Sequence, residues 1–277
     1  MIAIGRRRRK TKKMEADEKT SETTSVSTQV KPKKKRSRKK KALDLDKLAD
    51  SLKDTISDFL GLNILGIPEE LIKKIVREIL DIVITSSSYK PSTDTILKRI
   101  NRHLDIVRMI IAARMLEHMK DFTNEQLEFI VYYGGKMIIP ELPRLYKILV
   151  KKKLFDLLDY LKYVWEKYGQ PSPVKCPKCG FYSVMPDSTC FICGYTVTDE
   201  YLREELGFEE KFREYIKNAS VAELQEIIDI GFVLVDKNNI YNPKYRPRKP
   251  GYYFPIYLRK RDILLISEEI SRRKIKI

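Results

Sequence analysis

The four cysteines constrain this chain more than any other feature, because all of them lie within 18 consecutive positions of a 277-residue sequence. They form two C-x-x-C pairs separated by ten residues, and they are Cys176, Cys179, Cys190 and Cys193. A disulfide-stapled secreted protein spreads its cysteines across the fold, whereas four thiolates with this spacing can surround one zinc ion tetrahedrally. The spacing therefore predicts one structural Zn²⁺, bound by all four cysteines in a reducing compartment.

The two pairs share one further residue type, because Gly180 and Gly194 each follow the second cysteine of a pair. Residues 174–197 resemble the short zinc-ribbon family, in which both knuckles have the form C-x-x-C-G. The resemblance implies a metal-binding hairpin but no particular function, since such ribbons contact protein as often as nucleic acid. Two disulfides, an accidental cluster and iron in a rubredoxin-like site are the alternatives. Metal binding in such small modules supplies the folding energy, so the segment is expected to unfold without metal.

Basic residues are concentrated at the N-terminus. Residues 1–41 contain 17 Lys and Arg against 4 Asp and Glu, a net charge of +13, while the other 236 residues carry 38 bases and 34 acids. This arm has almost nothing apolar to bury, so it is predicted to be disordered when free and to contact phosphates without sequence preference. A solubilising tail or a nuclear localisation signal is the alternative. The candidate contacts are Arg6, Arg7, Arg8, Arg9, Lys33, Lys34, Lys35 and Arg36.

Residues 42–169 are predicted to form an all-α domain, because apolar residues recur there at three- and four-residue spacing. The expected helices lie near 43–60, 68–83, 92–120, 123–134 and 141–168, the last in two segments divided near 151–153. Thr123 and Gln126 match a capping box at the start of the fourth helix. Residues 169–173 form a Pro-containing linker that leads into the zinc ribbon at 174–197.

Residues 198–277 are predicted to form a small α+β domain, which makes the chain a mainly α, multi-module protein. Helices are expected near 199–206, 208–218 and 220–231, the third with Ser220 and Glu223 as a capping box. The apolar period then changes to two, which predicts a hairpin at 232–235 and 240–242 and a third strand at 252–258. Pro255 confines that strand to an edge, and a helix at 260–273 closes the chain.

Three helices followed by a hairpin is the element order of a winged helix. The residues give this interpretation little support, because the helix that would read DNA carries Glu223, Glu226 and Asp229 and no base. Phosphates would be repelled by this helix. If the domain is winged-helix-like, its hairpin could contact nucleic acid and its helix a protein.

A second basic segment, residues 237–261, holds eight Lys or Arg and no Asp or Glu, with aromatic residues interleaved. Basic side chains can follow a phosphate backbone while rings stack on unpaired bases. Alternatively, the rings pack on the preceding helices and the bases are only solvated. The candidate contacts are Lys244, Arg246, Arg248, Lys249, Tyr252, Tyr253, Arg259, Lys260 and Arg261.

No catalytic residue is predicted. Residues 134–136, Gly-Gly-Lys, lack the leading glycine and trailing Ser or Thr of a phosphate loop and are interpreted as a helix-ending turn. The pairs Asp44/Asp46 and Asp156/Asp159 are interpreted as acids on helix surfaces. We therefore expect no enzyme activity and identify no small-molecule substrate, with a divergent metal-dependent nuclease as the remaining enzymatic alternative.

The leading hypothesis is an accessory or scaffold protein of DNA or RNA metabolism that binds nucleic acid and a protein partner in a multi-subunit complex. A structural subunit of a large ribonucleoprotein or polymerase-type assembly is the alternative. No signal peptide and no spanning run of about 20 apolar residues is present, so we expect a cytoplasmic protein without membrane contact. It would be nucleoid-associated in an archaeon or nuclear in a eukaryote. The bias towards Lys, Glu and Ile favours a thermophilic archaeal source.

Overall fold

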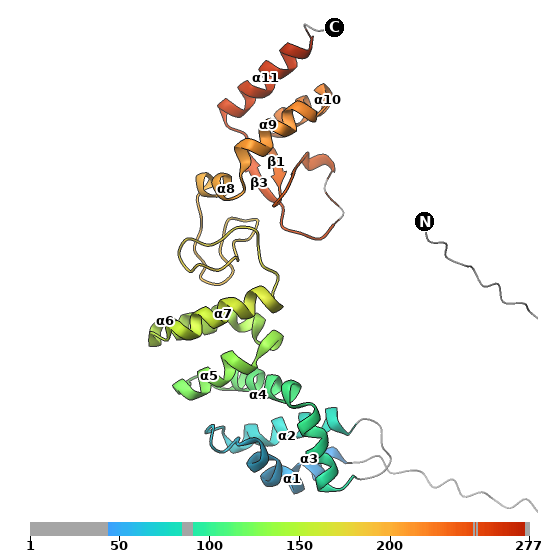
Figure 1. Ribbon diagram of the computed structural model, residues 1–277, viewed down its shortest axis with the longest axis vertical. Helices are drawn as coiled ribbons and strands as arrows, with labels where there is room; N and C mark the ends of the chain where they lie inside the picture. Colours follow the sequence, from blue (N-terminus) through green and yellow to red (C-terminus); the bar gives the residue numbers. More distant parts are fainter. Residues whose placement is uncertain (1–43, 85–90, 246, 248, 275–277) are drawn as a thin grey trace, which may run out of the picture. The chain divides into compact units, whose positions relative to one another are not determined.

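The computed structural model describes residues 44–84, 91–245, 247 and 249–274 (Figure 1). The basic arm with its eight candidate contacts lies outside the described residues, as do Arg246 and Arg248. The described residues belong to one compact unit that spans Ala42–Ile277. One contiguous cluster of buried side chains extends through this unit from Leu48 to Ile270. The predicted division of the unit into an all-α domain, a ribbon and a C-terminal domain stays a prediction.

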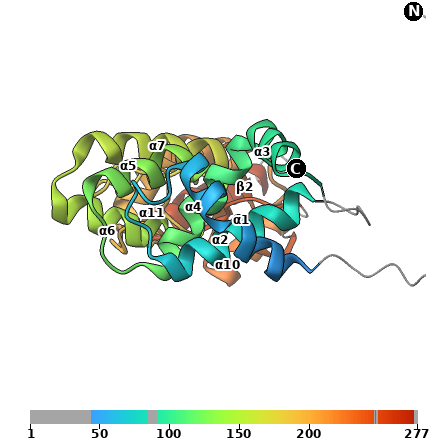
Figure 2. The same cartoon turned by 90° about the horizontal axis from the view of Figure 1, so that it is seen from below.

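The part of the unit that precedes the cysteines is helical, as the apolar spacing predicts. Helices α1 and α2 pack side by side through buried faces such as Leu48, Leu52 and Ile56 of α1 (Figure 2). Across the described residues, no helix combines the length and the apolar character that a bilayer crossing requires. The elements are α1 (Leu45–Leu60), α2 (Glu69–Val83), α3 (Thr93–Arg102), α4 (Leu104–His118), α5 (Asn124–Tyr133), the 3-10 helix η1 (Gly135–Glu141), α6 (Leu142–Lys152) and α7 (Phe155–Tyr168).

The single helix expected at 92–120 is wrong, because the chain breaks into α3 and α4 at His103. The backbone N–H of His103 donates to the carbonyls of both Arg99 and Ile100, which tightens the last turn of α3. No proline or glycine marks the break in the sequence. Both helices contact α2, but α3 also packs on α1, whereas α4 also packs on α5 and η1. Tertiary packing has therefore overridden a continuous local pattern.

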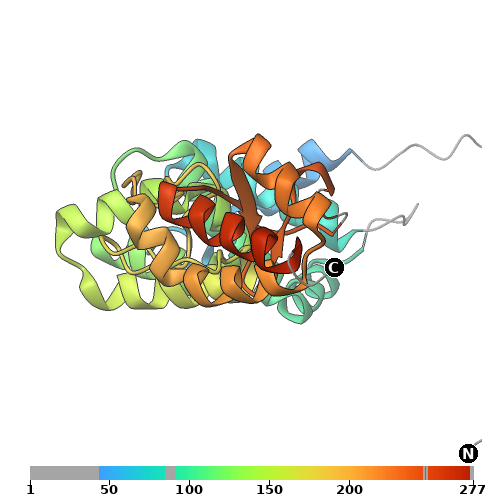
Figure 3. The ribbon, with the colours of Figure 1, turned by 90° about the horizontal axis from the view of Figure 1, so that it is seen from above.

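The C-terminal part combines helices with a three-stranded antiparallel sheet in the order β2-β1-β3. Pro255 pairs with Leu234, and β3 lies at an edge of the sheet, as the proline predicts. In Figure 3 the red helix α11 lies beside the orange helices α9 and α10, with which it is in contact. The elements are α8 (Asp199–Glu205), α9 (Phe208–Asn218), α10 (Val221–Ile230), β1 (Phe232–Val235), β2 (Ile240–Tyr241), the 3-10 helix η2 (Pro243–Tyr245), β3 (Phe254–Tyr257) and α11 (Lys260–Lys274).

The capping boxes predicted for α5 and α10 have different outcomes. At α5, the side chains of Thr123 and Gln126 each bond the backbone N–H of the other, so the box is complete. At α10, the Ser220 hydroxyl accepts from the N–H of Glu223 at 3.2 Å. The Glu223 carboxylate, however, accepts from the Tyr215 hydroxyl at 2.5 Å, so a tertiary contact uses the group that would have completed the second box.

Arginines from later helices cap the carboxyl ends of earlier ones. Arg99 of α3 donates to the carbonyl of Val83, the last residue of α2, at 3.0 Å. Arg144 of α6 donates to two carbonyls at the end of α4, at 2.5 and 2.6 Å. Arg273 of α11 donates to three carbonyls at the end of α9, at 2.6 to 2.9 Å. These guanidinium groups satisfy carbonyls that lack a partner within their helix and complement the negative end of its dipole.

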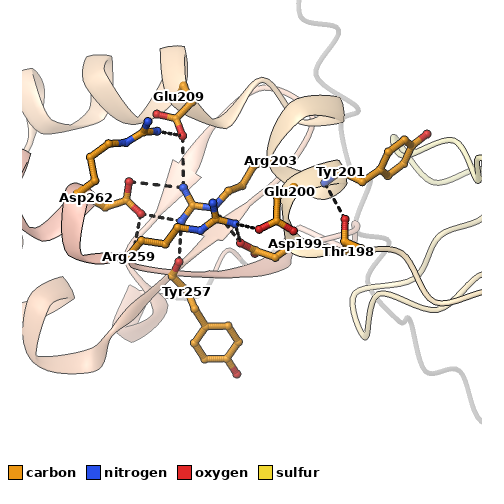
Figure 4. Close-up of polar contacts among 10 residues, drawn as sticks. Thr198, Asp199, Glu200, Tyr201, Arg203, Glu209, Tyr257, Arg259 and Asp262 are labelled. Carbon is orange, nitrogen blue, oxygen red and sulfur yellow. Dashed lines mark hydrogen bonds and ion pairs between the residues drawn. The ribbon is translucent and has the colours of Figure 1, made fainter.

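A buried ion pair joins α8 to the start of α11 (Figure 4). Arg203 is 4% exposed and Asp262 is 0% exposed, and Nη2 of the arginine lies 2.6 Å from Oδ2 of the aspartate. Arg203 also donates to the carbonyl of Tyr257 at 2.7 Å, and Asp262 accepts the backbone N–H of Arg259 at 2.8 Å. Buried charges are tolerated only when they are paired and hydrogen-bonded in this way.

The substitution Asp262→Ala is therefore expected to lower the free energy of unfolding of the C-terminal part by about 3–5 kcal/mol, because it leaves the Arg203 guanidinium buried without its carboxylate. Urea denaturation followed by circular dichroism measures this loss. Asp50→Ala is the matched control, since it breaks only an exposed pair with Lys73 at 2.7 Å. That pair should contribute less than about 1 kcal/mol, and equal losses in the two variants would contradict a structural role for the buried pair.

Candidate metal centre

The two cysteine knuckles have the same backbone hydrogen bonds. In the first, the N–H of Cys176 donates to the carbonyl of Phe181 at 2.8 Å, and the N–H of Gly180 donates to the carbonyl of Cys176 at 2.9 Å. The second knuckle repeats both bonds with its own first cysteine and glycine, at 2.8 Å each. Gly180 and Gly194 have φ angles of 76° and 69°, in the left-handed region that glycine enters without a Cβ clash. The C-x-x-C-G pattern is thus a pair of equivalent turns.

The four sulfur atoms converge on one point. All of them lie within 4.8 Å of one another. The Sγ atoms of Cys176 and Cys193 are 3.7 Å apart, and those of Cys179 and Cys190 are 3.6 Å apart. A tetrahedral ion with metal–sulfur bonds of about 2.3 Å requires sulfur separations of about 3.8 Å. All four cysteines are free thiols. The arrangement is compatible with a zinc-binding module and does not contain the disulfides that were an alternative interpretation.

Hydrogen-bond donors favour the thiolate form of Cys190. The pKa of this thiol is lowered, first by a hydrogen bond from the Cys179 thiol and then by the Ser183 hydroxyl and the backbone N–H of Cys193. The Ser183 oxygen lies 3.1 Å from the Cys190 sulfur, and the N–H of Cys193 donates to it at 3.4 Å. The pKa of Cys179, which donates its proton to Cys190 and is buried, is raised. Such outer donors stabilise the charged ligand that a metal needs.

Trp165 of α7 holds the second knuckle against the helices. Its indole ring stacks on Phe191, with ring centroids 5.6 Å apart, and its Nε1 donates to the carbonyl of Tyr182 at 2.7 Å. Trp165 is buried, and residues 174–197 contact both its apolar ring and its polar nitrogen. The sequence places Trp165 in a helical pattern and carries no signal that its partner lies beyond the linker.

Two tyrosines make further contacts with the first knuckle. Tyr146 of α6 meets Phe181 edge-on, with ring centroids 6.0 Å apart. Tyr201 of α8 donates its hydroxyl to the carbonyl of Lys175 at 2.8 Å. The metal-binding segment is therefore anchored on its N-terminal side by α6 and α7 and on its C-terminal side by α8.

Three of the predicted basic contacts are paired with acids. Ion pairs join Lys244 to Glu226, Arg259 to Asp199 and Glu200, and Arg261 to Glu209. All of these basic side chains remain at least partly exposed. Exposed pairs contribute only about 0–1 kcal/mol, so a phosphate group could compete for them. Lys260 begins α11 and is exposed.

The other described candidates, Lys249, Tyr252 and Tyr253, line one cleft with a volume of about 870 Å³. Lys237 and Tyr241, which were not among the predicted contacts, line the same cleft. Their proximity depends on how the loop before β3 folds back on the β1–β2 turn. Sequence spacing alone cannot specify that fold.

Three of the four acids considered for catalysis make capping or ion-pair contacts in the described part of the chain. Asp44 accepts the N–H of Lys47 as the cap of α1, and Asp46 pairs with Arg77 at 2.6 Å. Asp159 pairs with Lys162 at 2.9 Å on the surface of α7. Gly134 ends α5 as expected, but Gly135 and Lys136 begin the 3-10 helix η1 instead of completing a turn. The expectation that the chain is not an enzyme stays a prediction.

Comparison of the chain with protein-family models, with curated proteins and with solved structures finds no match. The likeness of residues 174–197 to a zinc ribbon therefore rests on the cysteine spacing and on the knuckle geometry. The metal centre has to be interpreted from its own residues and contacts.

Removing the metal with a chelator is expected to unfold residues 174–197 and to shift the emission of Trp165, the only tryptophan of the chain, to longer wavelength. The shift follows because the indole loses its buried contact with Phe191 and meets water. Fluorescence spectra before chelation, after chelation and after addition of Zn²⁺ measure it. Cys176→Ser should give the shifted spectrum without chelator. Complete metal loss with unchanged emission would contradict a structural role for the metal.

Proposed function

We propose that Cys176, Cys179, Cys190 and Cys193 bind one structural zinc ion. The support is a set of four sulfurs within 4.8 Å of one another, three buried and one half-buried, with hydrogen-bond donors beside Cys190. Four protein ligands leave no open position for water, so the ion would stabilise the fold and not catalyse a reaction. Elemental analysis should find one zinc per chain. The visible absorption of an iron–thiolate centre in the purified protein would overturn zinc in favour of the rubredoxin-like alternative.

We further propose that this zinc-stapled protein is an accessory or scaffold protein of DNA or RNA metabolism that binds the phosphate backbone. The observation that carries the proposal is the distribution of charge. The arm has a net charge of +13, and residues 237–261 hold eight bases and no acid. Such segments release counterions from nucleic acid and bind with strong salt dependence. The helical domain and the ribbon would then position these basic segments and present a surface to a protein partner.

A role as a structural subunit of a larger assembly is the second candidate, and an apolar groove beside α1, α4 and α5 favours it. Ile64 in the turn after α1 is 91% exposed, and Phe59 and Tyr133 also contribute exposed rings to the groove. Exposed apolar patches of this kind are typical of protein contacts. The two candidates are compatible, because a subunit of a nucleoprotein complex can use both surfaces.

Deleting residues 1–41 should reduce the salt dependence of nucleic-acid binding. Each phosphate contact contributes about 0.9 to the slope of log K against log salt for duplex DNA, so losing an arm with 17 bases should lower the slope by several units. Fluorescence anisotropy with a labelled duplex, repeated between low and moderate salt, measures the slope. Replacing only Arg6–Arg9 by alanine should give an intermediate slope. If the intact protein does not bind at low salt, the proposal fails.

The divergent nuclease alternative has its own test. Labelled DNA and RNA would be incubated with the intact protein and Mg²⁺ or Mn²⁺. We expect no cleavage above the level of a chelated control. Metal-dependent turnover that Asp156→Asn or Asp159→Asn abolishes would establish an enzyme instead.

A further inference from the structure

The cleft of about 870 Å³ lies where three segments meet that are far apart in the sequence. Its walls come from the linker at 169–173, from the metal-binding segment through Tyr182, and from the C-terminal part through the β1–β2 turn and the loop before β3. The hydroxyl of Tyr252 donates to the carbonyl of Gln170 at 2.5 Å and joins the linker to this loop. The cleft is therefore a product of the tertiary structure and not of one motif.

The tyrosines of the cleft are held in fixed orientations by their own hydroxyl groups. Tyr253 donates to the carbonyl of Lys249 at 2.9 Å, and Tyr241 donates to the carboxylate of Asp236 at 2.9 Å. Their rings meet edge-on with centroids 5.7 Å apart, and both rings stay half-buried. A ring that is already fixed loses little conformational entropy when a flat ligand stacks on it. The aromatic wall is thus prepared for planar groups.

Two lysines of the cleft are available to an anion. Within the described residues, the ammonium groups of Lys237 and Lys249 have no carboxylate within 4.0 Å, whereas Lys244 is paired with Glu226. Lys249 is exposed, and both lysines belong to the segment that contains no acid. They provide positive charge beside the aromatic wall.

Three acids also line the cleft, and they limit which ligands fit. Asp236 is occupied, because its carboxylate accepts the backbone N–H groups of Asn238 and Asn239 at 2.7 Å each as well as the Tyr241 hydroxyl. Glu166 and Glu205 are exposed and can accept hydrogen bonds. They would repel a phosphate but would accept from the amino groups of nucleobases, as carboxylates do from cytosine. The cleft therefore offers lysines to an anionic backbone and carboxylates to planar amino-bearing groups.

We propose that this cleft binds single-stranded nucleic acid, with unpaired bases stacked on Tyr252 and Tyr253 and phosphates at Lys237 and Lys249. This inference rests on the proposed function. It adds that the bound nucleic acid is single-stranded and that the cleft is its binding site. Bases in a duplex hide their faces in the stack, so only unpaired bases can meet these rings. We expect the basic arm to bind duplex nucleic acid.

The test uses the full-length, zinc-loaded protein and labelled 20-residue oligonucleotides, poly-dC and poly-rC, beside a duplex of the same length. Tyr253→Leu should weaken binding of the single strands by roughly 5- to 100-fold, the range of one lost base–aromatic stack, and leave the duplex affinity unchanged. Its salt slope should stay the same, because the ring carries no charge. Lys249→Ala should lower the single-strand slope by about 0.7. The difference in affinity between poly-dC and poly-rC tells whether DNA or RNA is preferred.

Tyr257→Leu is the matched control, because Tyr257 is 66% exposed on β3 and does not line the cleft. It should leave both affinities unchanged. Circular dichroism and zinc content establish that each variant is folded. Because a variant can fail to fold, photo-crosslinking of the unaltered protein to an oligonucleotide with 5-iodouracil provides a second measurement. Crosslinks to the peptide with Tyr252 and Tyr253 support the proposal.

Four results overturn the cleft proposal, and they separate it from the proposed function. If the protein binds duplex and single strand but Tyr253→Leu binds both as well as the unaltered protein does, the cleft is not the site and the proposed function stands. Crosslinks that fall only within residues 1–41 lead to the same conclusion. If the intact protein binds neither oligonucleotide at low salt, both proposals fail. Capture of a peptide segment in place of the oligonucleotide would assign the cleft to a protein partner.

Discussion

The structure of residues 174–197 depends on bringing four cysteine sulfurs together at one point. Residues 174–197 contain only two isolated β-bridges, Val184 with Cys190 and Thr189 with Thr196, and form no regular sheet. Thiolates this close repel one another unless a cation neutralises them, and two of the sulfur pairs here are 3.6 and 3.7 Å apart. A metal bound at the proposed site would therefore hold the segment in the form that presents Phe191 and the Tyr182 carbonyl to Trp165. Through the linker and Tyr252, it would also support the shape of the cleft in the C-terminal part.

The arginines of the folded unit serve mainly internal contacts. Arg99, Arg144 and Arg273 cap helix ends, and Arg203 is buried with Asp262. A count of basic residues therefore overstates how much positive charge the folded unit offers to a phosphate backbone. The planar guanidinium suits this role, because it can bridge several carbonyls.

Much of the local structure was predictable because local chemistry determines it. The cysteine pairs, the Thr123 cap, the Pro255 edge strand and the helix-ending Gly134 each depend on a few neighbouring residues, and each has the predicted outcome. The predictions that failed concern features that depend on residues far apart in the sequence. Nothing near His103 in the sequence announces a break, and Glu223 bonds to Tyr215 of the preceding helix instead of completing a cap. The cleft also could not be predicted from the sequence, because Lys237 and Lys249 come together only through a turn and a loop.

The arginine caps also affect the order in which the helices gain their full set of contacts during synthesis. A ribosome releases the chain from its N-terminus, and early parts begin to fold before later ones exist. Each capped helix precedes the residue that caps it, so α2, α4 and α9 emerge with unmatched carbonyls at their ends. The carbonyls at the end of α9 stay unmatched until Arg273 of α11 has been added. A nascent chain that stalls before Arg273 would leave the end of α9 frayed and open to proteases.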